Sequence, residues 1–253
     1  MIPARKNFLG ELLVFGIARR SVWRAFHSVH MRVAEPLPLP PSKLDAPIIF
    51  YVNHSSWWDG YLAHLISRQV YNLSPYLMMD EQQLSRYPFF AWAGCFGVNR
   101  NDAREALKSL EYIVKELKQK SPCILWMFPQ GEIMPLELRP LGFHSGLGWL
   151  VRELGDCYIA PVSFRFDFLR EQYPDIFINI GKFTRFRAGE KINTRKLTAQ
   201  LEETLTLDLD CLRDDVSNGR LADFETIVQG KSSTDIVFSF IVEKLLRIKP
   251  KEA

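Results

Sequence analysis

The chain has 253 residues, enough for one sizeable domain with a full hydrophobic core. Its formal net charge is only +3, and no stretch combines dense basic residues with aromatic ones, so the composition does not favour a nucleic-acid partner. The four cysteines are widely spaced without a Cys-x-x-Cys pair, and three of them lie in apolar segments, which indicates reduced core residues rather than a disulfide framework.

Residues 7–31 mix apolar and basic side chains, including Phe8, Leu12, Arg19 and Arg20, as in a helix that lies in a lipid headgroup layer. The same apolar positions would also suit packing against the rest of the domain, and both interpretations stay open. The apolar run is far shorter than the roughly 20 residues that a membrane span requires, and it does not resemble a signal peptide.

A proline-rich stretch over residues 37–41 follows this segment and is expected to be a stiff, extended linker. We therefore divide the chain into an N-terminal segment, residues 1–41, that either associates with a membrane or packs on the domain, and a main domain, residues 42–253.

A histidine and an aspartate stand five residues apart just after an apolar run. Residues 46–52 predict a buried strand, and Asp59 opens a helix expected over residues 59–70. In the turn between them, Asp59 can accept a hydrogen bond from the imidazole of His54 and fix its tautomer, which leaves the other nitrogen to act as a general base on a hydroxyl. The alternative is that Asp59 only caps its helix and His54 is a polar turn residue.

A second apolar run, residues 123–128, ends in a Pro129-Gln130-Gly131-Glu132 turn. Proline and glycine on either side of Gln130 favour a sharp turn that presents backbone N–H groups. Since ligands of open α/β sheets bind at the carboxyl ends of the strands, we expect this turn and the His54 turn to form one site.

The remaining pattern alternates helices and strands and predicts an α/β fold, a single layered domain with a mixed, mostly parallel sheet flanked by helices. His144 is expected at the start of its helix or in a substrate channel. The last helix would either cover the sheet or touch lipid. The expected helices are residues 103–120, 142–154, 194–213 and 233–248, and the further strands are residues 157–166 and 175–180.

Four short blocks in order resemble the glycerolipid acyltransferases, of which 1-acylglycerol-3-phosphate acyltransferase is typical. The first is His-x4-Asp, with His54 and Asp59, and about 75 residues later comes Phe-Pro-x-Gly, at residues 128–131. Between them, residues 94–100 are similar to the family's Gly-x-x-Phe-x-x-Arg block. Residues 158–162 are similar to its apolar-Pro-Val block, so that the resemblance covers residues 45–170.

This resemblance implies transfer of a fatty acyl group from a thioester, acyl-CoA or acyl carrier protein, to a lipid hydroxyl at a membrane surface. His54 would be the general base and Asp59 its partner, backbone N–H groups around Gly131 would stabilise the oxyanion, and neither a metal nor a further cofactor is expected. The enzyme would be peripheral, on the cytoplasmic face of a membrane. Residues expected to bind substrate are Arg100, Phe128, Pro129, Gln130, Gly131, Glu132 and Pro161.

The third block departs from the family pattern, which usually reads Phe-Pro-Glu-Gly-Thr/Ser-Arg. Here Gln130 keeps hydrogen-bonding capacity without the charge, while Glu132 and Ile133 replace a hydroxyl and a phosphate-binding cation. Arg100 would remain as a phosphate clamp, with Arg139 or Arg165 as substitutes. The acceptor is then either lysophosphatidic acid or a non-phosphorylated lipid or glycolipid alcohol.

Two other functions are compatible with the same residues. The His54–Asp59 pair would also serve a thioesterase or lipid hydrolase with water as acceptor, and the altered turn would suit a catalytically weak lipid-binding protein. A metal enzyme is not favoured, because no recognisable ligand spacing connects His54, Asp59, His64 and Asp80. Of Trp57 and Trp58, we expect one to pack in the core and the other to line a groove.

Overall fold

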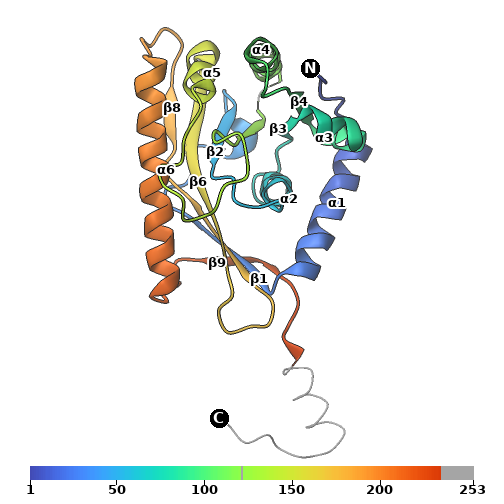
Figure 1. The fold of residues 1–253 in the computed structure, drawn as a ribbon, viewed down its shortest axis with the longest axis vertical. Helices are drawn as coiled ribbons and strands as arrows, with labels where there is room; N and C mark the ends of the chain where they lie inside the picture. Colours follow the sequence, from blue (N-terminus) through green and yellow to red (C-terminus); the bar gives the residue numbers. More distant parts are fainter. Residues whose placement is uncertain (121, 235–253) are drawn as a thin grey trace, which may run out of the picture.

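The computed structural model describes residues 1–120 and 122–234, which fold around one sheet (Figure 1). The strand order along the sheet is β4-β3-β5-β2-β6-β7-β1-β9, and β8 pairs with β6. The strands are β1 (Ser28–Val33), β2 (Ile48–Val52), β3 (Pro75–Asp80), β4 (Cys95–Val98), β5 (Ile124–Met127), β6 (Cys157–Asp167), β7 (Asp175–Ile180), β8 (Thr184–Phe186) and β9 (Glu225–Gln229).

The central strands are parallel and buried on both faces. β2 lies between β5 and β6, parallel to both, with Tyr51 opposite Met127 on one side and Pro161 on the other. All five residues of β2 are buried, which explains why this strand reads as a continuous apolar run rather than an alternating one. The antiparallel partners β7 and β9 lie towards one edge, so the sheet is mixed and mostly parallel, as predicted.

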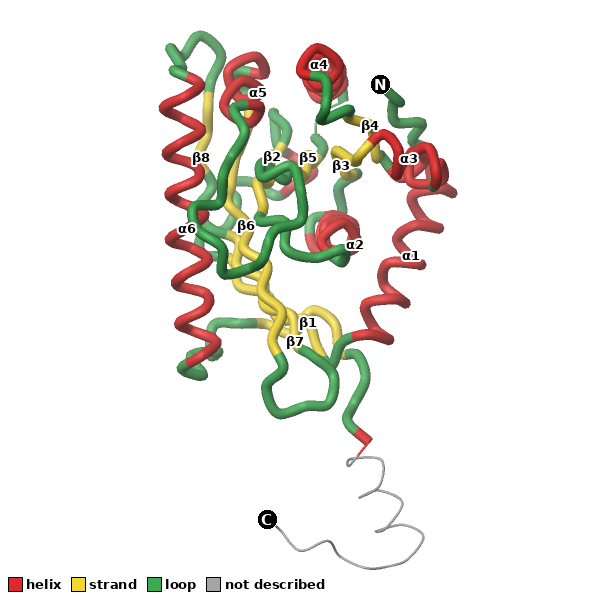
Figure 2. The backbone as a smooth tube through the Cα atoms, viewed as in Figure 1, coloured by secondary structure: helices red, strands yellow, loops and turns green. Residues whose placement is uncertain are grey.

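Helices cover both faces of the sheet and give a three-layer α/β architecture (Figure 2). Alternate residues of β2 face opposite layers: Phe50 packs with α1 and α2, and Ile49 packs with α4, α5 and α6. The helices are α1 (Phe8–Ala25), α2 (Asp59–Leu65), α3 (Glu81–Arg86), α4 (Ala103–Gln119), α5 (Gly146–Leu154) and α6 (Thr194–Ser217), and the shorter helical turns are η1 (Pro41–Lys43), η2 (Ile66–Val70) and η3 (Pro88–Ala93).

The N-terminal helix is shorter than its mixed apolar and basic composition predicts. Asn7 caps it by accepting a hydrogen bond from the Gly10 N–H at 2.8 Å, and the helix ends at Ala25. Residues 28–31, expected to continue the helix, instead belong to β1, which pairs with β7 and β9. The reason is tertiary, because pairing on both edges buries Val29 completely and outweighs local helix propensity.

The other predicted elements differ from the structure mainly at their ends. α5 begins at Gly146, four residues after the expected position, because residues 142–145 form an irregular loop and turn in which Gly142 has a positive φ of 74°. α6 continues to Ser217, beyond residue 213. The helix expected over residues 233–248 lies almost wholly outside the described residues. Among the helices that the structure describes, none is both long and apolar enough to cross a bilayer.

Candidate active site

The turn after β2 places His54 against a buried carboxylate. The imidazole Nδ1 lies 2.9 Å from Asp59 Oδ2, and Asp59, in the first turn of α2, is fully buried. A carboxylate only accepts hydrogen bonds, so Nδ1 carries the proton and donates it to Asp59. The tautomer assigned in this way leaves Nε2 as the basic nitrogen, on a side chain that is about one quarter exposed at 24%.

Asp59 does not cap its helix, because Trp58 occupies the N-cap position and no side-chain cap hydrogen bond forms there. Its Oδ2 also accepts hydrogen bonds from the backbone N–H groups of Ser55 at 2.9 Å and Ser56 at 3.0 Å, so one oxygen organises the whole turn. Burial raises the pKa of the Asp59 carboxyl above its ordinary value, while the hydrogen bonds from His54, Ser56 and Ser55 oppose that shift. The carboxylate is therefore held where an imidazolium beside it would be strongly stabilised.

Asn53 anchors the beginning of the same turn, and the sequence pattern did not single it out. Its side chain accepts a hydrogen bond from the Phe164 N–H at 2.8 Å and donates to the Phe164 carbonyl at 3.0 Å. The buried amide thereby extends the pairing of β2 with β6 by one residue, in the manner of a backbone group. The only sequence signal was its place just before His54, at the end of an apolar run.

The loop after β5 holds the main chain of His54 from both sides. The Gln130 side-chain oxygen accepts a hydrogen bond from the His54 N–H at 2.7 Å, and the Met134 N–H donates to the His54 carbonyl at 2.8 Å. Gln130 is buried, with 6% of its surface exposed. Phe128 packs on the imidazole, with the two ring centroids 4.6 Å apart. The two predicted turns do meet, and Gln130 contacts the His54 backbone.

Gly131 lies between Arg100 and His144 at the outer side of the same turn. Its φ of +75° is in the left-handed region, and a Cβ there would lie 3.2 Å from His144 Nε2. The Arg100 guanidinium donates a hydrogen bond to the Gly131 carbonyl, and its Nε lies 3.9 Å from Asp80 Oδ2. The Gly131 N–H donates to the Phe128 carbonyl at 3.0 Å. The Gly131 N–H, which was expected to stabilise an oxyanion, therefore makes a hydrogen bond within the turn.

The remaining predicted substrate residues are spread over different environments. Pro129 is buried, and its carbonyl accepts a hydrogen bond from the His144 N–H at 2.9 Å. Glu132 and Ile133 are exposed at the surface of the turn. Pro161 is buried within β6 opposite Tyr51, where its ring contacts the Gly181 region on the α6 side of the sheet. Its surroundings are those of a packing residue.

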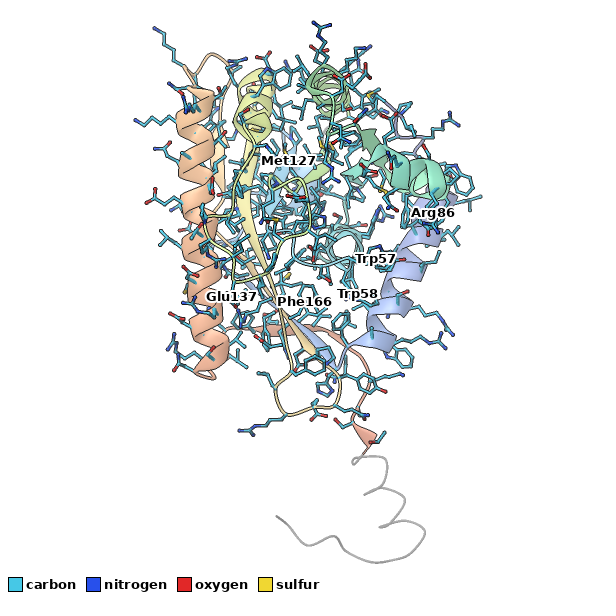
Figure 3. All side chains as sticks on the ribbon, in the orientation of Figure 1. Trp57, Trp58, Arg86, Met127, Glu137 and Phe166 are labelled. Atoms are coloured by element: carbon cyan, nitrogen blue, oxygen red, sulfur yellow. The ribbon has the colours of Figure 1, made fainter. Side chains whose placement is uncertain are left out.

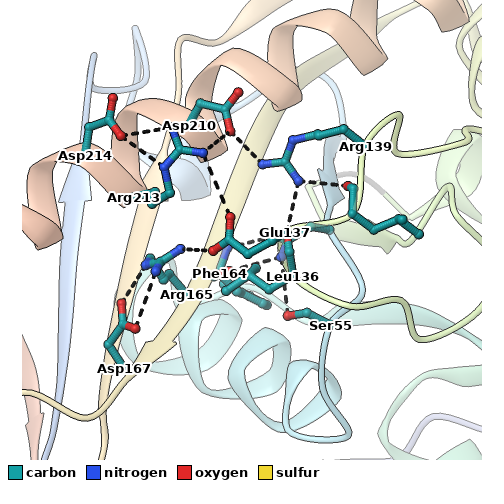
Figure 4. Close-up of polar contacts among 12 residues, drawn as sticks. Ser55, Leu136, Glu137, Arg139, Phe164, Arg165, Asp167, Asp210, Arg213 and Asp214 are labelled. Atoms are coloured by element: carbon teal, nitrogen blue, oxygen red, sulfur yellow. Dashed lines mark hydrogen bonds and ion pairs between the residues drawn. The ribbon is translucent and has the colours of Figure 1, made fainter.

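Arg139 and Arg165 are both paired with carboxylates (Figure 4). Arg165 on β6 contacts Glu137 at 2.7 Å and Asp167 at 2.5 Å, and Arg139 contacts Asp210 of α6 at 2.8 Å. This network links the loop after β5 to β6 and α6. Their expected use as substitute phosphate ligands is not supported, since a phosphate would have to displace these carboxylates.

The two tryptophans beside His54 have different environments, on the side of the domain that faces α1 (Figure 3). Trp58 packs edge-on against Phe26, with ring centroids 5.0 Å apart, and belongs to the core layer under α1. Trp57 is 64% exposed and contacts Tyr61 at 5.0 Å between ring centroids. Trp58 is thus the packing residue, and the groove-lining role stays a prediction for Trp57.

Chemically, this arrangement presents one basic nitrogen beside a buried carboxylate on a turn whose main chain is fixed. That is the arrangement a general base needs in order to deprotonate a hydroxyl or a water. Within residues 1–120 and 122–234, no three His, Cys, Asp or Glu side chains gather as metal ligands would.

Comparison with known proteins agrees with the fold. The structure is similar to the crystal structure of PlsC, the 1-acyl-sn-glycerophosphate (LPA) acyltransferase from Thermotoga maritima, with a TM-score of 0.57. Sequence identity is 14%, and the match covers 80% of this chain and 79% of that chain, a degree of likeness that shows a shared fold. A comparison with curated protein sequences found no match. The acyltransferase family profile matches residues 29–165, more than half of the sequence, and the chain therefore belongs to the acyltransferase family.

Proposed function

We propose that this protein transfers a fatty acyl group from an acyl thioester to the hydroxyl of a lipid acceptor, with His54 as general base. The observation that carries the proposal is the hydrogen bond of 2.9 Å between His54 Nδ1 and the buried Asp59. Membership of the acyltransferase family supports the reaction class. The hydroxyl or thiol of a nucleophilic side chain is not needed, because the acceptor oxygen itself attacks.

The reaction would proceed by direct transfer. His54 Nε2 takes the proton of the acceptor hydroxyl as the oxygen attacks the thioester carbonyl, and the resulting imidazolium is stabilised by Asp59. Collapse of the tetrahedral intermediate breaks the carbon–sulfur bond, and the departing thiolate recovers the proton from the imidazolium. The donor, acyl-CoA or acyl carrier protein, leaves as a free thiol, and the base is regenerated.

We propose further that the acceptor has no phosphate at its reacting end, as in a non-phosphorylated lipid or glycolipid alcohol. Arg100 is engaged by the Gly131 carbonyl and faces Asp80, while Glu132 and Ile133 are exposed at the turn. A dianionic phosphate placed there would meet carboxylates without a dedicated cation, which disfavours its binding. An uncharged alcohol has no such cost.

The enzyme would act as a peripheral protein at a membrane surface, through the outer face of α1. One side of this helix packs on the domain through Val14, Ala18 and Val22, so the packing interpretation holds for that side. The opposite side leaves large apolar residues exposed, Trp23 near the C-terminal end and four near the N-terminal end, which suits insertion among lipid headgroups. The four near the N-terminal end are Phe8, Leu9, Leu12 and Leu13.

The contribution of α1 is testable by substitution. Phe8→Ser combined with Leu12→Ser should reduce co-sedimentation with anionic vesicles by about tenfold, because two exposed apolar anchors are lost. The melting temperature should not change, as both side chains are exposed in the folded protein. Undiminished sedimentation would exclude this face of α1 as the lipid contact.

The test of the reaction is an acceptor screen with radiolabelled acyl-CoA and acyl carrier protein, using His54→Ala as the blank. Acceptors are lysophosphatidic acid, several uncharged lipid alcohols, and water alone. Transfer to an uncharged alcohol that His54→Ala abolishes is the expected result. Acylation of lysophosphatidic acid would overturn the proposed acceptor but not the chemistry, and free fatty acid as sole product would favour a hydrolase.

A further inference from the structure

The turn between β6 and β7 exposes apolar side chains at its tip. Phe168 and Leu169 have 73% and 45% of their surfaces exposed, and Arg170 beside them is also exposed. β6 continues for five residues beyond Val162, the partner of the last β2 residue, before it reaches Asp167. The hairpin consequently projects past the edge of the sheet where His54 lies, at the lower end of the molecule (Figure 1).

This tip is held in place rather than left as a loose loop. The Gln172 N–H donates to Ser233 Oγ at 2.8 Å, and the Pro174 carbonyl accepts from the His27 N–H at 2.9 Å. Lys231 Nζ lies 5.0 Å from the centre of the Tyr173 ring. The two exposed apolar side chains thus cannot be hidden simply by refolding the turn.

The end of α1 lies at the same end of the molecule and adds to this surface. Residues 230 and 231 join the two, because the Lys231 N–H donates to the Phe26 carbonyl at 3.0 Å while its side chain reaches Tyr173. Trp23, in the last two turns of α1, is a further exposed apolar residue. The exposed apolar side chains at this end are therefore Trp23, Phe168 and Leu169.

Basic residues occur on the same segments as these apolar ones, α1, the hairpin and residue 231, and the neighbouring carboxylates are occupied. Asp167 pairs with Arg165, and Glu171 accepts a hydrogen bond from Ser233 and lies 3.8 Å from His27. The excess positive charge suits an anionic surface. The basic residues at this end are Arg20, Arg24, Arg170 and Lys231.

We propose that the β6–β7 hairpin tip is a second membrane contact, which inserts Phe168 and Leu169 into the headgroup layer of an anionic bilayer. A lipid surface fits better than a protein partner, since two projecting side chains fall far short of the roughly 800 Å² per partner that a stable protein interface buries. Exposed apolar residues accompanied by basic ones match the interfacial pattern of membrane-binding segments.

Two contacts would determine orientation as well as affinity. A bilayer that touches both the C-terminal end of α1 and the hairpin tip would lie at the end of the sheet towards which β2 points and at which the His54 turn follows it. If the proposed function is right, a lipid acceptor then reaches His54 without leaving the membrane. The membrane contact itself does not depend on that function.

The experiment uses a fluorophore at the tip. Cys211 on α6 is exposed, whereas Cys95, Cys123 and Cys157 are buried. Cys211 can therefore be labelled as a control site away from the hairpin tip. Leu169→Cys in a Cys211→Ser background is labelled with an environment-sensitive nitrobenzoxadiazole dye, and the unmodified chain is labelled at Cys211. Both proteins are titrated with vesicles of phosphatidylcholine and phosphatidylglycerol.

A blue shift with increased emission at position 169, without a shift at position 211, is the expected result. Failure of the protein to bind these vesicles, or binding with an unshifted signal at position 169, would overturn the proposal. Vesicle binding with an unshifted signal at position 169 would make a protein partner the alternative for the hairpin tip.

A second measurement needs no label. Phe168→Ala combined with Leu169→Ala should weaken vesicle co-sedimentation about tenfold, whereas Leu207→Ala, which removes a similarly exposed apolar side chain from α6, should not. Acyl transfer to a detergent-dispersed acceptor should be equal in all three proteins. Equal vesicle binding by the tip variant would refute the contact even if acyl transfer is confirmed.

Discussion

The turn after β2 and the turn after β5 meet at one edge of the sheet but differ in how they are held. In the first, the N–H, the carbonyl and the Nδ1 of His54 all have hydrogen-bond partners, and Asp59 is fully buried. In the second, Glu132 and Ile133 project into solvent. Buried hydrogen-bonded groups tolerate little change, because each lost partner leaves an unsatisfied polar atom, whereas an exposed turn can vary freely. Two of the departures from the family pattern, Glu132 and Ile133, lie in this exposed part of the second turn, whereas Gln130 is buried and keeps a hydrogen bond to the His54 N–H.

The strongest test of this contrast replaces His54 and His144 by alanine, one at a time. His54→Ala should lower the rate of acyl transfer by about 10²–10⁴, the usual contribution of a general base. His144→Ala, in the same loop as the second turn, should cost less than about tenfold, because no carboxylate among residues 1–120 and 122–234 pairs with His144 as Asp59 pairs with His54. Single-turnover rates with matched circular dichroism spectra would check both. A larger loss for His144→Ala would move the base to the second turn.

Asp59→Asn separates activity from stability. The asparagine amide keeps an acceptor oxygen for the Ser55 and Ser56 N–H groups, but it is neutral and cannot stabilise the imidazolium that forms on His54. The rate should therefore fall by about 10²-fold or more. If Asp59 were only a helix cap, the rate would be unaffected.

The same variant should not lose stability at neutral pH. Burial raises the pKa of Asp59 in the folded state, so ionisation of this group costs stability as pH rises from the ordinary carboxyl range through the raised pKa. Asp59→Asn should therefore unfold at an equal or higher temperature than the wild type at pH 7, and the difference should shrink towards pH 3. A lower melting temperature for the variant at pH 7 would contradict this account.

Gln130 tests how much the second turn supports the first. Gln130→Ala leaves the buried His54 N–H without an acceptor, which should cost about 1–3 kcal/mol of stability and roughly tenfold in rate. Gln130→Glu keeps an acceptor oxygen in the same place and should retain the activity of the wild type. The pair is compared by thermal unfolding and by kcat. Equal behaviour of the alanine and glutamate variants would show that the contact does not position His54.

The smallest expected effect concerns the exposed residues of the second turn, Glu132 and Ile133. Gln130→Glu with Glu132→Thr and Ile133→Arg restores the usual family pattern and should improve use of lysophosphatidic acid by a fewfold, mainly through KM, since an exposed cation adds little binding free energy. The rate with an uncharged alcohol should stay nearly constant. If KM for the phosphorylated acceptor does not fall, phosphate binds elsewhere or not at all.

Much of the fold was readable from local patterns. The apolar runs predicted β2, β5 and β7, and the amphipathic repeat predicted α4 to within a residue at its C-terminal end. β1 was mistaken for helix because its pairing partner β7 lies about 150 residues away in the chain. Edge strands such as β9 carry weak patterns, since one side of the strand faces solvent.

The contact between His54 and Asp59 could be predicted from the sequence alone. The two residues are only five positions apart, and a strand-to-turn-to-helix segment brings such residues together. Only the tertiary structure decided which groups hold that pair. Asn53 bonds to a residue 111 positions away, and Gln130 bonds to His54 across 76 positions. Arg139 and Arg165, candidates for binding phosphate by charge alone, are paired with carboxylates from other elements. Hydrogen bonds and ion pairs between distant segments leave no periodicity in a sequence, so they become visible only once the strands are assembled side by side.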